Sequence, residues 1–197
     1  HYSSRRQRQM CIRDRPGCYP TASILGLLPV IPYLQENSKI ILDAKSGISG
    51  AGKSSVENGL EEDIKENFKS YNVGFHRHQP EIKDFLKTEF NLEHEIIFIP
   101  HLLPLFRGEY VTLYCEVSQN DLDLNELYES YYEKHKLVRV KEKGEIAEIK
   151  EVINTFYCDI SVSYAFQSNT IIVNSAIDNL LKGAASQAIQ CLDIMSN

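Results

Sequence analysis

A run of regular alternation in the middle of the chain limits its fold more than any other feature. Within Tyr110–Ser118 the apolar side chains of Val111, Leu113, Cys115 and Val117 fall at every second position. Successive side chains of a β-strand point to opposite faces, so this spacing predicts a strand with one buried face. A half-buried strand needs neighbouring strands and a layer packed on its apolar side, so we expect a sheet covered by helices.

Helix signals surround this strand. Proline suits the first turn of a helix, and Pro20 and Pro80 each stand at such a position, Pro20 in a helix predicted over Tyr19–Leu28. Two more helices are predicted at Leu124–His135 and Ile177–Met195. Further strands are predicted at Lys39–Ala44, His94–Pro100, Val138–Lys141, Cys158–Phe166 and Thr170–Asn174. This order of helices and strands predicts an α+β fold.

The chain divides into one large unit and two ends. Residues 16–174 contain no clear linker or repeat, and we interpret them as one domain, followed by a terminal helix in residues 175–197. Residues 1–15 hold five Arg and one Asp, almost no apolar side chains and no Met at position 1. We expect residues 1–15 to be a non-native leader; a basic arm for nucleic acid or a membrane is the alternative.

Composition narrows the partners and the compartment. Beyond the leader the chain carries 16 basic and 26 acidic residues, which argues against nucleic acid as a partner. The five cysteines form no C-x-x-C pair and follow no secretory signal, which fits reduced thiols in the cytoplasm. No apolar run approaches the roughly 20 residues that a membrane-spanning helix needs, so we expect no membrane contact.

Cys18 is the first candidate for chemistry. It stands at the N-terminus of the helix predicted over Tyr19–Leu28, where unpaired backbone N–H groups and the helix dipole stabilise a thiolate. This position suits a nucleophile. The alternative is a small buried side chain, which is what most free cysteines are.

The segment His76-Arg77-His78, just before the Pro80 helix, is the second candidate. Either imidazole could act as a general acid or base, and Arg77 could bind an anionic group. A His-x-His pair can also bind a metal, but no further ligands follow at a recognisable spacing, so we expect no metal site. Histidines without a chemical role are the other interpretation.

Residues Gly47–Ser54 (GISGAGKS) match the phosphate-binding pattern G-x-x-x-x-G-K-[ST], so a P-loop nucleotide-binding protein is an alternative. A P-loop leads into a helix that packs on the sheet. Residues 55–69 instead contain Gly59 and few apolar side chains, and no clear apolar strand ending in a magnesium-binding Asp follows. The context therefore argues against the motif.

Five motifs in sequence order resemble those of the N-acetyl-γ-glutamyl-phosphate reductase family. They are PGCYPTA at 16–22, SGISGAG at 46–52, HRHQPEI at 76–82, FIPHLLP at 98–104 with Arg107-Gly108, and IDNL at 177–180 leading into KGAA with Gln187 and Gln190. Their order and spacing match from residue 16 to the end of the chain. Because the SGISGAG loop is the family's own, Lys53 and Ser54 complete the P-loop pattern by coincidence.

The resemblance implies a particular α+β fold. It is the catalytic and oligomerisation domain of the type found in glyceraldehyde-phosphate and aspartate-semialdehyde dehydrogenases, a mixed sheet flanked by helices. The family's Rossmann domain would precede Pro16, and no G-x-G-x-x-G follows a predicted strand here. We therefore expect the Rossmann domain to be missing, residues 175–197 to pack on it in a full-length homo-oligomer, and this fragment to be inactive; a fragment that serves only as an assembly module is a further alternative.

The resemblance also implies a reaction, the NADPH-dependent reduction of N-acetyl-γ-glutamyl phosphate to the semialdehyde and phosphate in arginine biosynthesis. Cys18 would attack the acyl phosphate to form a thioester, and NADPH would deliver hydride to it. His76 or His78 would take the thiol proton and return it, and the sequence does not choose between them.

The remaining site residues are carried over from the same resemblance. The residues expected to bind the small acyl-phosphate substrate are Arg77, Arg107, Tyr71 and Ser49, and those expected to bind NADP(H) are Ser46, Gly47, Lys182 and Gln187. Relatives that act on aminoadipyl phosphate or on carrier-bound substrates would share Cys18 and the histidine pair. The identity of the acyl chain is therefore left open.

Overall fold

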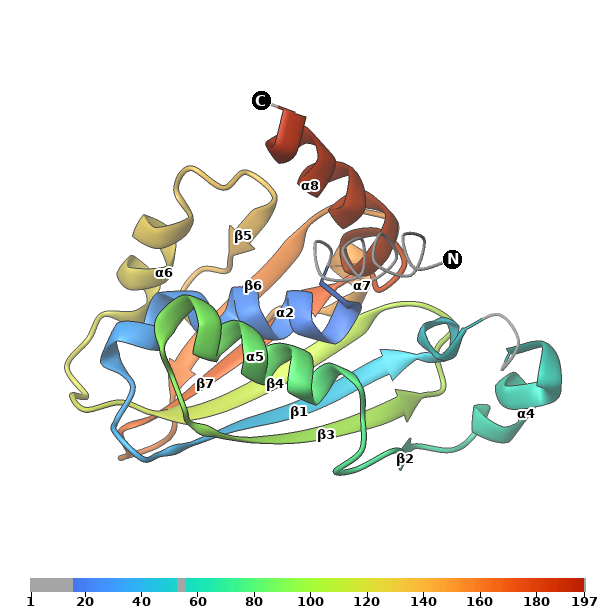
Figure 1. The fold of residues 1–197 in the computed structure, drawn as a ribbon, viewed down its shortest axis with the longest axis horizontal. Helices are drawn as coiled ribbons and strands as arrows, with labels where there is room; N and C mark the ends of the chain where they lie inside the picture. The colour runs from blue at the N-terminus through green and yellow to red at the C-terminus, as the bar shows by residue number, and fades with distance from the viewer. Residues whose placement is uncertain (1–15, 53–55, 197) are drawn as a thin grey trace, which may run out of the picture.

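The computed structural model describes residues 16–52 and 56–196, and it shows a mixed sheet with helices packed against it (Figure 1). The expected leader and the residues Lys53 and Ser54 lie outside this range. The strand order is β2-β3-β1-β4-β7-β6-β5. The strands are β1 (Lys39–Gly47), β2 (Lys69–Ser70), β3 (Glu95–Leu103), β4 (Glu109–Glu116), β5 (Val138–Val140), β6 (Cys158–Tyr164) and β7 (Thr170–Ile177).

The pairs β1–β3 and β5–β6 are parallel and the other neighbours are antiparallel, so the predicted α+β class with a mixed sheet is confirmed. Helices α2 and α5 run across one face of this sheet (Figure 1). The helices are α2 (Cys18–Leu27), α4 (Glu61–Ile64), α5 (His78–Phe90), α6 (Leu124–Tyr132), α7 (Ile149–Val152) and α8 (Ser186–Ser196). Shorter turns are the 3₁₀ segments η1 (Leu28–Tyr33) and η2 (Ile48–Ala51) and the π-helical segments η3 (Val56–Leu60) and η4 (Leu181–Ala185).

The core lies between α2 and the middle of the sheet. Leu113 of β4 pairs in register with Leu42 of β1 and with Val173 of β7, and all three side chains are fully buried. Gly26 of α2 sits on this row, because a Cβ there would lie 2.7 Å from Leu113 Cδ1. Glycine at this position lets the helix backbone approach the sheet closely. The alternation noted in the sequence therefore marks the face of β4 that α2 covers.

The predicted helices at Tyr19–Leu28 and Leu124–His135 correspond to α2 and α6. Local residues explain where α6 begins and where α5 ends. Asp123 caps α6 by accepting a hydrogen bond from the Glu126 backbone N at 3.2 Å. Asn91 ends α5 in a left-handed conformation with φ 53°, which Asn tolerates well. The helix that we predicted to open at Pro80 begins two residues earlier, at His78.

Two predictions of the sequence pattern need correction. The helix predicted over Ile177–Met195 is wrong at its start, because β7 continues through Ile177 and the helical turns begin only at Leu181. Residues 175–177 are held by pairing with β4 and β6, so a boundary after residue 174 would cut a strand. β1 likewise runs past the predicted KIILDA strand to Gly47.

Between residues 16 and 196, leaving out 53–55, no helix combines the length and the apolar character needed to cross a bilayer. The same described part of the chain contains no group of three or more His, Cys, Asp or Glu side chains placed to hold a metal ion.

Candidate active site

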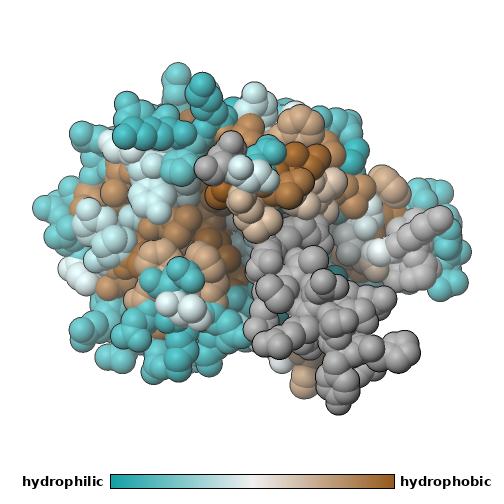
Figure 2. Space-filling view, turned by 45° about the horizontal axis from the view of Figure 1, so that its top comes forward, coloured by the Kyte–Doolittle hydropathy of each residue, from teal (hydrophilic) through white to brown (hydrophobic). Residues whose placement is uncertain are grey.

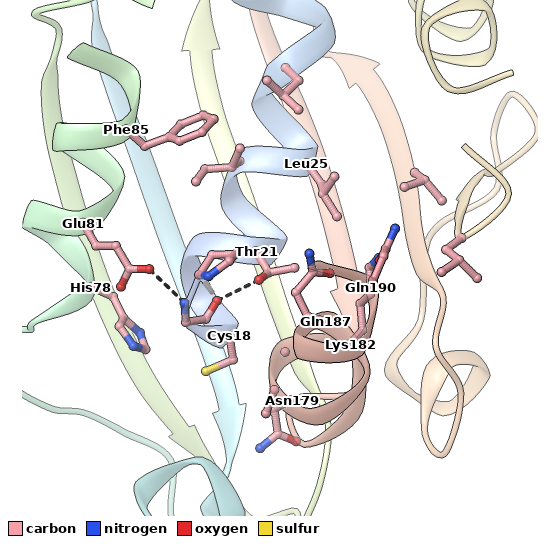
Figure 3. Close-up of a pocket in the computed structure, with 18 of the residues that line it drawn as sticks. Cys18, Thr21, Leu25, His78, Glu81, Phe85, Asn179, Lys182, Gln187 and Gln190 are labelled. Carbon is pink, nitrogen blue, oxygen red and sulfur yellow. Dashed lines mark hydrogen bonds between the residues drawn. The ribbon is translucent and has the colours of Figure 1, made fainter. Parts of the chain in front are cut away.

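Cys18 is the first residue of α2. Gly17 precedes it in an extended conformation. The carbonyl and the N–H of Gly17 are both hydrogen-bonded to side chains. Thr21 Oγ1 donates to the Gly17 carbonyl at 2.8 Å, and the Gly17 N–H donates to Glu81 Oε1 at 2.8 Å (Figure 3). Because Glu81 belongs to α5, this bond ties the N-terminus of α2 to the neighbouring helix.

Burial decides the ionisation of the Cys18 thiol. Desolvation raises its pKa well above the ordinary value, and the negative charge of Glu109 raises it further. The backbone N–H groups of Tyr19 and Cys18 lower the pKa, as expected at a helix N-terminus, but by less. The net direction is opposite to the thiolate stabilisation that the helix position predicts. Cys18 therefore needs a base before it can act as a nucleophile.

His76 and His78 lie together beside this helix end. Their ring centroids are 4.8 Å apart, and the His78 backbone N–H donates to His76 Nδ1 at 3.2 Å. The ring of His78 rests against Gly17, where a Cβ would lie 2.5 Å from Nε2. A glycine at position 17 is thus what allows this imidazole to reach the start of α2.

Both imidazoles are neutral at pH 7. Burial lowers the pKa of His78 to about 3, and the positive charges of His76 and Arg77 add to this effect. Burial, followed by the Arg77 charge, also lowers the pKa of His76. A neutral imidazole has one N–H donor and one acceptor nitrogen, so either ring can accept a proton.

Tyr71 lies behind the histidine pair. Its hydroxyl is 3.4 Å from His76 Nε2 and 3.5 Å from the Tyr19 hydroxyl, which in turn donates to the His101 carbonyl at 3.3 Å. Burial raises the pKa of Tyr71 to about 12, so the phenol is protonated. Tyr71 thus contacts His76 through its hydroxyl and can orient this ring.

The segment η4 closes the opposite side of Cys18. Gly183 lies so near that a Cβ on it would be 2.6 Å from Cys18 Cβ. Lys182 is only 3% exposed, and its Nζ donates to Gln190 Oε1 at 2.7 Å. Burial lowers the pKa of Lys182. The Oε1 atom of Gln187 is buried and has no hydrogen-bond partner among the described residues, so it is an acceptor in need of a donor.

These elements border one groove of about 1820 Å³. Its apolar wall comes from α2, α5 and the residues after α6, and Figure 2 shows apolar side chains gathered in a hollow ringed by hydrophilic ones. Of the residues predicted for the site, the groove is lined by Cys18, Ser49, Arg77, His78, Lys182 and Gln187. Segments that are far apart in the sequence, from residue 18 to residue 187, therefore meet at one cavity.

A family model described as semialdehyde dehydrogenase, dimerisation domain, matches residues 18–179. The chain belongs to this semialdehyde dehydrogenase family. Its relatives include two proteins named N-acetyl-gamma-glutamyl-phosphate reductase. One, from Thermoanaerobacter, is 43% identical over 91% of this chain and 53% of its own length. The other, from Halothermothrix orenii, is 44% identical over 92% of this chain and 54% of its own length. The chain thus spans about half the length of these relatives, and the resemblance seen in the motifs is confirmed.

Solved structures support the same fold at much lower sequence identity. Aspartate semialdehyde dehydrogenase II from Vibrio cholerae superposes with a TM-score of 0.73 at 16% identity, covering 92% of this chain and 61% of that one. A probable aspartate-semialdehyde dehydrogenase from Pseudomonas aeruginosa gives a TM-score of 0.75 at 14% identity, with the same shares covered. At these identities the likeness concerns the fold, which matches the expected semialdehyde dehydrogenase type.

Five of the predicted site residues of this semialdehyde dehydrogenase domain do not line the groove. They are His76 and Tyr71, described above, and Arg107, Ser46 and Gly47. Arg107, expected at the substrate, forms an ion pair with buried Asp178, at 2.9 Å from Nε to Oδ2, and also bonds to Asn154. Its guanidinium is therefore already in use within the fold. Ser46, expected at the cofactor, is buried in β1 and turns its hydroxyl to the Gly47 carbonyl at 3.0 Å.

Backbone hydrogen bonds hold the start of the glycine-rich loop, at Gly47, against the segment before β4. The backbone N–H groups of Gly47, Ile48 and Ser49 donate to the carbonyls of Gly108, Leu105 and Phe106 at 2.8–2.9 Å. A P-loop binds phosphate through free backbone N–H groups, and these three N–H groups of the described part of the loop are already bonded. A Cβ on Gly47 would also lie 2.8 Å from the Phe106 backbone. In this semialdehyde dehydrogenase domain the glycine serves close packing of two loops.

Sequence reasoning missed one residue of the site, Glu109. It is the first residue of β4 and lies two positions before Val111, so the alternation over Tyr110–Ser118 places it on the face that α2 covers. A carboxyl group in that row was the available signal. The pattern drew attention to the apolar residues and left the acidic one at its start unexamined.

Proposed function

We propose that this chain carries the catalytic half of an NADPH-dependent reductase that converts N-acetyl-γ-glutamyl phosphate to the semialdehyde and phosphate, in arginine biosynthesis. The observation that carries the proposal is the position of Cys18 at a helix N-terminus inside a groove, between the His78 ring and η4. The names of the relatives support the choice of substrate.

The chain's own residues suffice for the first half-reaction. The Cys18 sulfur attacks the acyl carbon, the bond between that carbon and the phosphate oxygen breaks, and phosphate leaves with the electron pair, so that a thioester remains. Arg77 is the exposed arginine at the groove, and a guanidinium can pair with phosphate or carboxylate through two hydrogen bonds. Ser49, held by Asn179 Nδ2 at 3.0 Å, adds a hydroxyl on the same side.

His78 is the member of the histidine pair that lines the groove, with His76 behind it. As a neutral imidazole it can exchange a proton with a substrate oxygen as the charge on that oxygen changes. His76, held between His78 and Tyr71, positions the ring. This gives the two expected histidines different roles.

The groove residues also suit a nicotinamide. Its carboxamide offers N–H donors, and the buried Gln187 Oε1 is an acceptor that lacks one among the described residues. Lys182 lies beside it on the same wall, so Lys182 and Gln187 would hold this end of NADP(H). A reduced nicotinamide, when bound, supplies the hydride that reduces the thioester carbon.

Thioester formation tests the proposal without any need for the cofactor. The chain is mixed with N-acetyl-γ-glutamyl phosphate, and phosphate release and the mass of each cysteine peptide are measured. We expect one phosphate per chain, an acyl group on Cys18, and loss of both in Cys18→Ser. The matched variant Cys191→Ser, which changes the other half-exposed cysteine, should behave as wild type. Phosphate release that survives in Cys18→Ser would overturn the assignment.

We further propose that the chain associates with a second copy through the face of the sheet that α2 and α5 do not cover. Alternate side chains there are only half-buried, including Ile41, Ile97, Ile99 and Tyr114. The dimerisation-domain match supports this use of the face. Sedimentation should give a dimer for wild type and a monomer for Ile99→Lys; a monomeric wild type would contradict it.

A further inference from the structure

The side-chain amide of Asn179 joins two loops at the groove. Asn179 lies between β7 and η4, is only 3% exposed, and lines the groove together with Ser49. Its Oδ1 accepts the backbone N–H of Gly108 at 2.8 Å, and its Nδ2 donates to Ser49 Oγ at 3.0 Å. Asn179 leads into η4, whose Gly183 contacts Cys18, so the amide is placed at the reacting end of the groove (Figure 3).

The Gly108 N–H determines how this amide is turned. A backbone N–H can only donate, so the amide oxygen of Asn179 must face Gly108 and the amide nitrogen must face Ser49. Gly108 cannot turn to offer a carbonyl instead, because its carbonyl accepts the Gly47 N–H at 2.8 Å and a Cβ on it would collide with Ile149. The two ends of the Asn179 amide are therefore not interchangeable.

This orientation decides the direction of the Ser49 hydroxyl hydrogen. Because Ser49 Oγ accepts from the Asn179 amide, its single hydrogen points elsewhere. The Ser49 backbone N–H is bonded to the Phe106 carbonyl at 2.9 Å, so the residue is held in place. Within residues 16–52 and 56–196 no group accepts the hydroxyl hydrogen, and Ser49 lines the groove. Ser49 thus offers the groove a hydrogen-bond donor.

Ser46, the other serine at the start of this loop, shows the contrast. It is 2% exposed, and its hydroxyl donates to the Gly47 carbonyl at 3.0 Å. Its hydrogen is therefore used within the chain. Of these two serines, the one bonded to Asn179 is the one that keeps its hydrogen for a ligand.

We propose that Asn179 is a positioning residue that turns the Ser49 hydroxyl hydrogen into the groove, so that Ser49 donates to a phosphoryl oxygen of the acyl phosphate. The oxygens of an ionised phosphoryl group only accept hydrogen bonds, so a donor of fixed direction suits them. The identity of this anion rests on the proposed function, whereas the direction of the hydroxyl rests on the hydrogen bonds. A donor that is already oriented needs no rearrangement when phosphate leaves with the electron pair.

Inorganic phosphate carries the same oxygens and tests the donor without any reaction of the substrate. Cys18 is alkylated with iodoacetamide at constant pH and ionic strength, and mass spectrometry of its peptide gives the phosphate concentration that halves the rate. This concentration reports phosphate binding, because the reactivity of the thiol cancels in the ratio of the rates. Phosphate should protect wild type, and Ser49→Ala should need about tenfold more of it, as for loss of a hydrogen bond to a charged group.

Asn179→Asp reverses the contact with Ser49 and keeps the other one. One carboxylate oxygen still accepts the Gly108 N–H, but the second accepts the Ser49 hydroxyl hydrogen and draws it away from the groove. The half-protecting phosphate concentration should rise about 10²-fold, through the lost donor and the added negative charge. The matched variant Asn174→Asp changes an amide that donates to Ser161 Oγ at 3.5 Å outside the groove, and it should follow wild type.

A double-mutant cycle separates the turned hydroxyl from the charge. In Ser49→Ala no hydroxyl remains to be turned, so Asn179→Asp should add only about tenfold there, against about 10²-fold in wild type. Equal factors in the two backgrounds would overturn the inference, because Asn179 would then act through charge or through the fold alone.

A second variant covers the case in which Asn179→Asp does not fold. Asn179→Leu releases the hydroxyl, and an undirected hydroxyl donates less well. Ser49→Ala should therefore cost only about threefold in the Asn179→Leu background. A cost that stays at about tenfold contradicts the positioning role.

The outcomes also separate this inference from the function on which it rests. If phosphate does not protect wild type, the inference is wrong, while acylation of Cys18 by N-acetyl-γ-glutamyl phosphate still tests the function. If Cys18→Ser still releases phosphate from the acyl phosphate, the proposed function fails, and the cycle with inorganic phosphate still decides the role of Asn179.

Discussion

Gly183 and Cys18 are in contact across two elements: a methyl group on Gly183 would lie 2.6 Å from Cys18 Cβ and 3.3 Å from Ile177 Cδ1. Neither neighbour can give way easily, because one begins α2 and the other ends β7. Gly183→Ala should therefore displace η4 or Cys18. We expect a loss of roughly 1–3 kcal/mol in the free energy of unfolding, as for other overpacked sites.

The same variant should also slow acylation of Cys18, because displacement of a nucleophile by even a fraction of an ångström disturbs its approach. Denaturant unfolding and thioester formation measure the two effects. Ala185→Ser, at an exposed position of the same turn, is the control and should match wild type in both. If Gly183→Ala has the unfolding free energy and the acylation rate of wild type, η4 accommodates the methyl group and the predicted overpacking is wrong.

Replacement of Glu109 by leucine should stabilise the fold above neutral pH. The pKa of this carboxyl is raised from 4.5 to about 8 in the folded chain. Between these values the unfolded chain has lost the proton that the folded chain keeps, so stability falls as pH rises, by up to about 1.4 kcal/mol per pH unit. In Glu109→Leu this contribution is absent.

The difference is measured as the unfolding free energy of both proteins between pH 6.5 and 8, a range above the window in which His78 acts. The gap in favour of Glu109→Leu should widen with pH. A constant gap would show that Glu109 is ionised in the folded chain throughout.

The sequence predicted part of the site and missed the charge state of its cysteine. The motif order placed Cys18, His78 and Lys182 in one site, because short signatures with fixed spacing report a shared fold. The direction of the Cys18 pKa was out of reach, since it depends on burial and on Glu109, a residue 91 positions away in the chain that β4 brings beneath α2. Local reasoning saw only the helix N-terminus.

The predicted start of the last helix was wrong because it, too, depends on contacts that are distant in the sequence. Helical periodicity from residue 177 onward suggested one long helix, but pairing with β4 and β6 holds Ile177 in a strand. Hydrogen bonds to neighbouring strands outweigh the weak helix propensity of a few residues. The sequence also could not predict that Arg107 pairs with Asp178, because the two residues are 71 positions apart.

His78 should remain neutral far below the usual histidine range. Its pKa falls from 6.5 to about 3 on folding, so between these values the unfolded chain binds a proton that the folded chain does not. Stability contributed by the neutral ring is present above pH 6.5 and is lost as pH falls toward 3, by up to about 1.4 kcal/mol per pH unit. NMR of the ring protons should detect no titration of His78 between pH 7 and 4.5. A midpoint near 6.5 would contradict the burial argument.

Arg107 and Arg77 should separate a structural arginine from one that binds substrate. Asp178 is fully buried and accepts bonds from Arg107 and from the backbone N–H groups of Asn154, Leu180 and Leu181. Arg107→Ala removes one donor from a buried carboxylate, so it should lower the free energy of unfolding by roughly 1–3 kcal/mol.

Arg77→Ala, at an exposed position on the groove, should leave stability within about 0.5 kcal/mol of wild type. It should instead raise the acyl-phosphate concentration that gives half-maximal acylation of Cys18, because an anion loses its bidentate partner. Thermal unfolding and a substrate titration, carried out on both variants, measure the two effects. If Arg107→Ala weakens substrate binding while stability is unchanged, its pairing with Asp178 gives way to substrate, and the roles assigned to the two arginines must be exchanged.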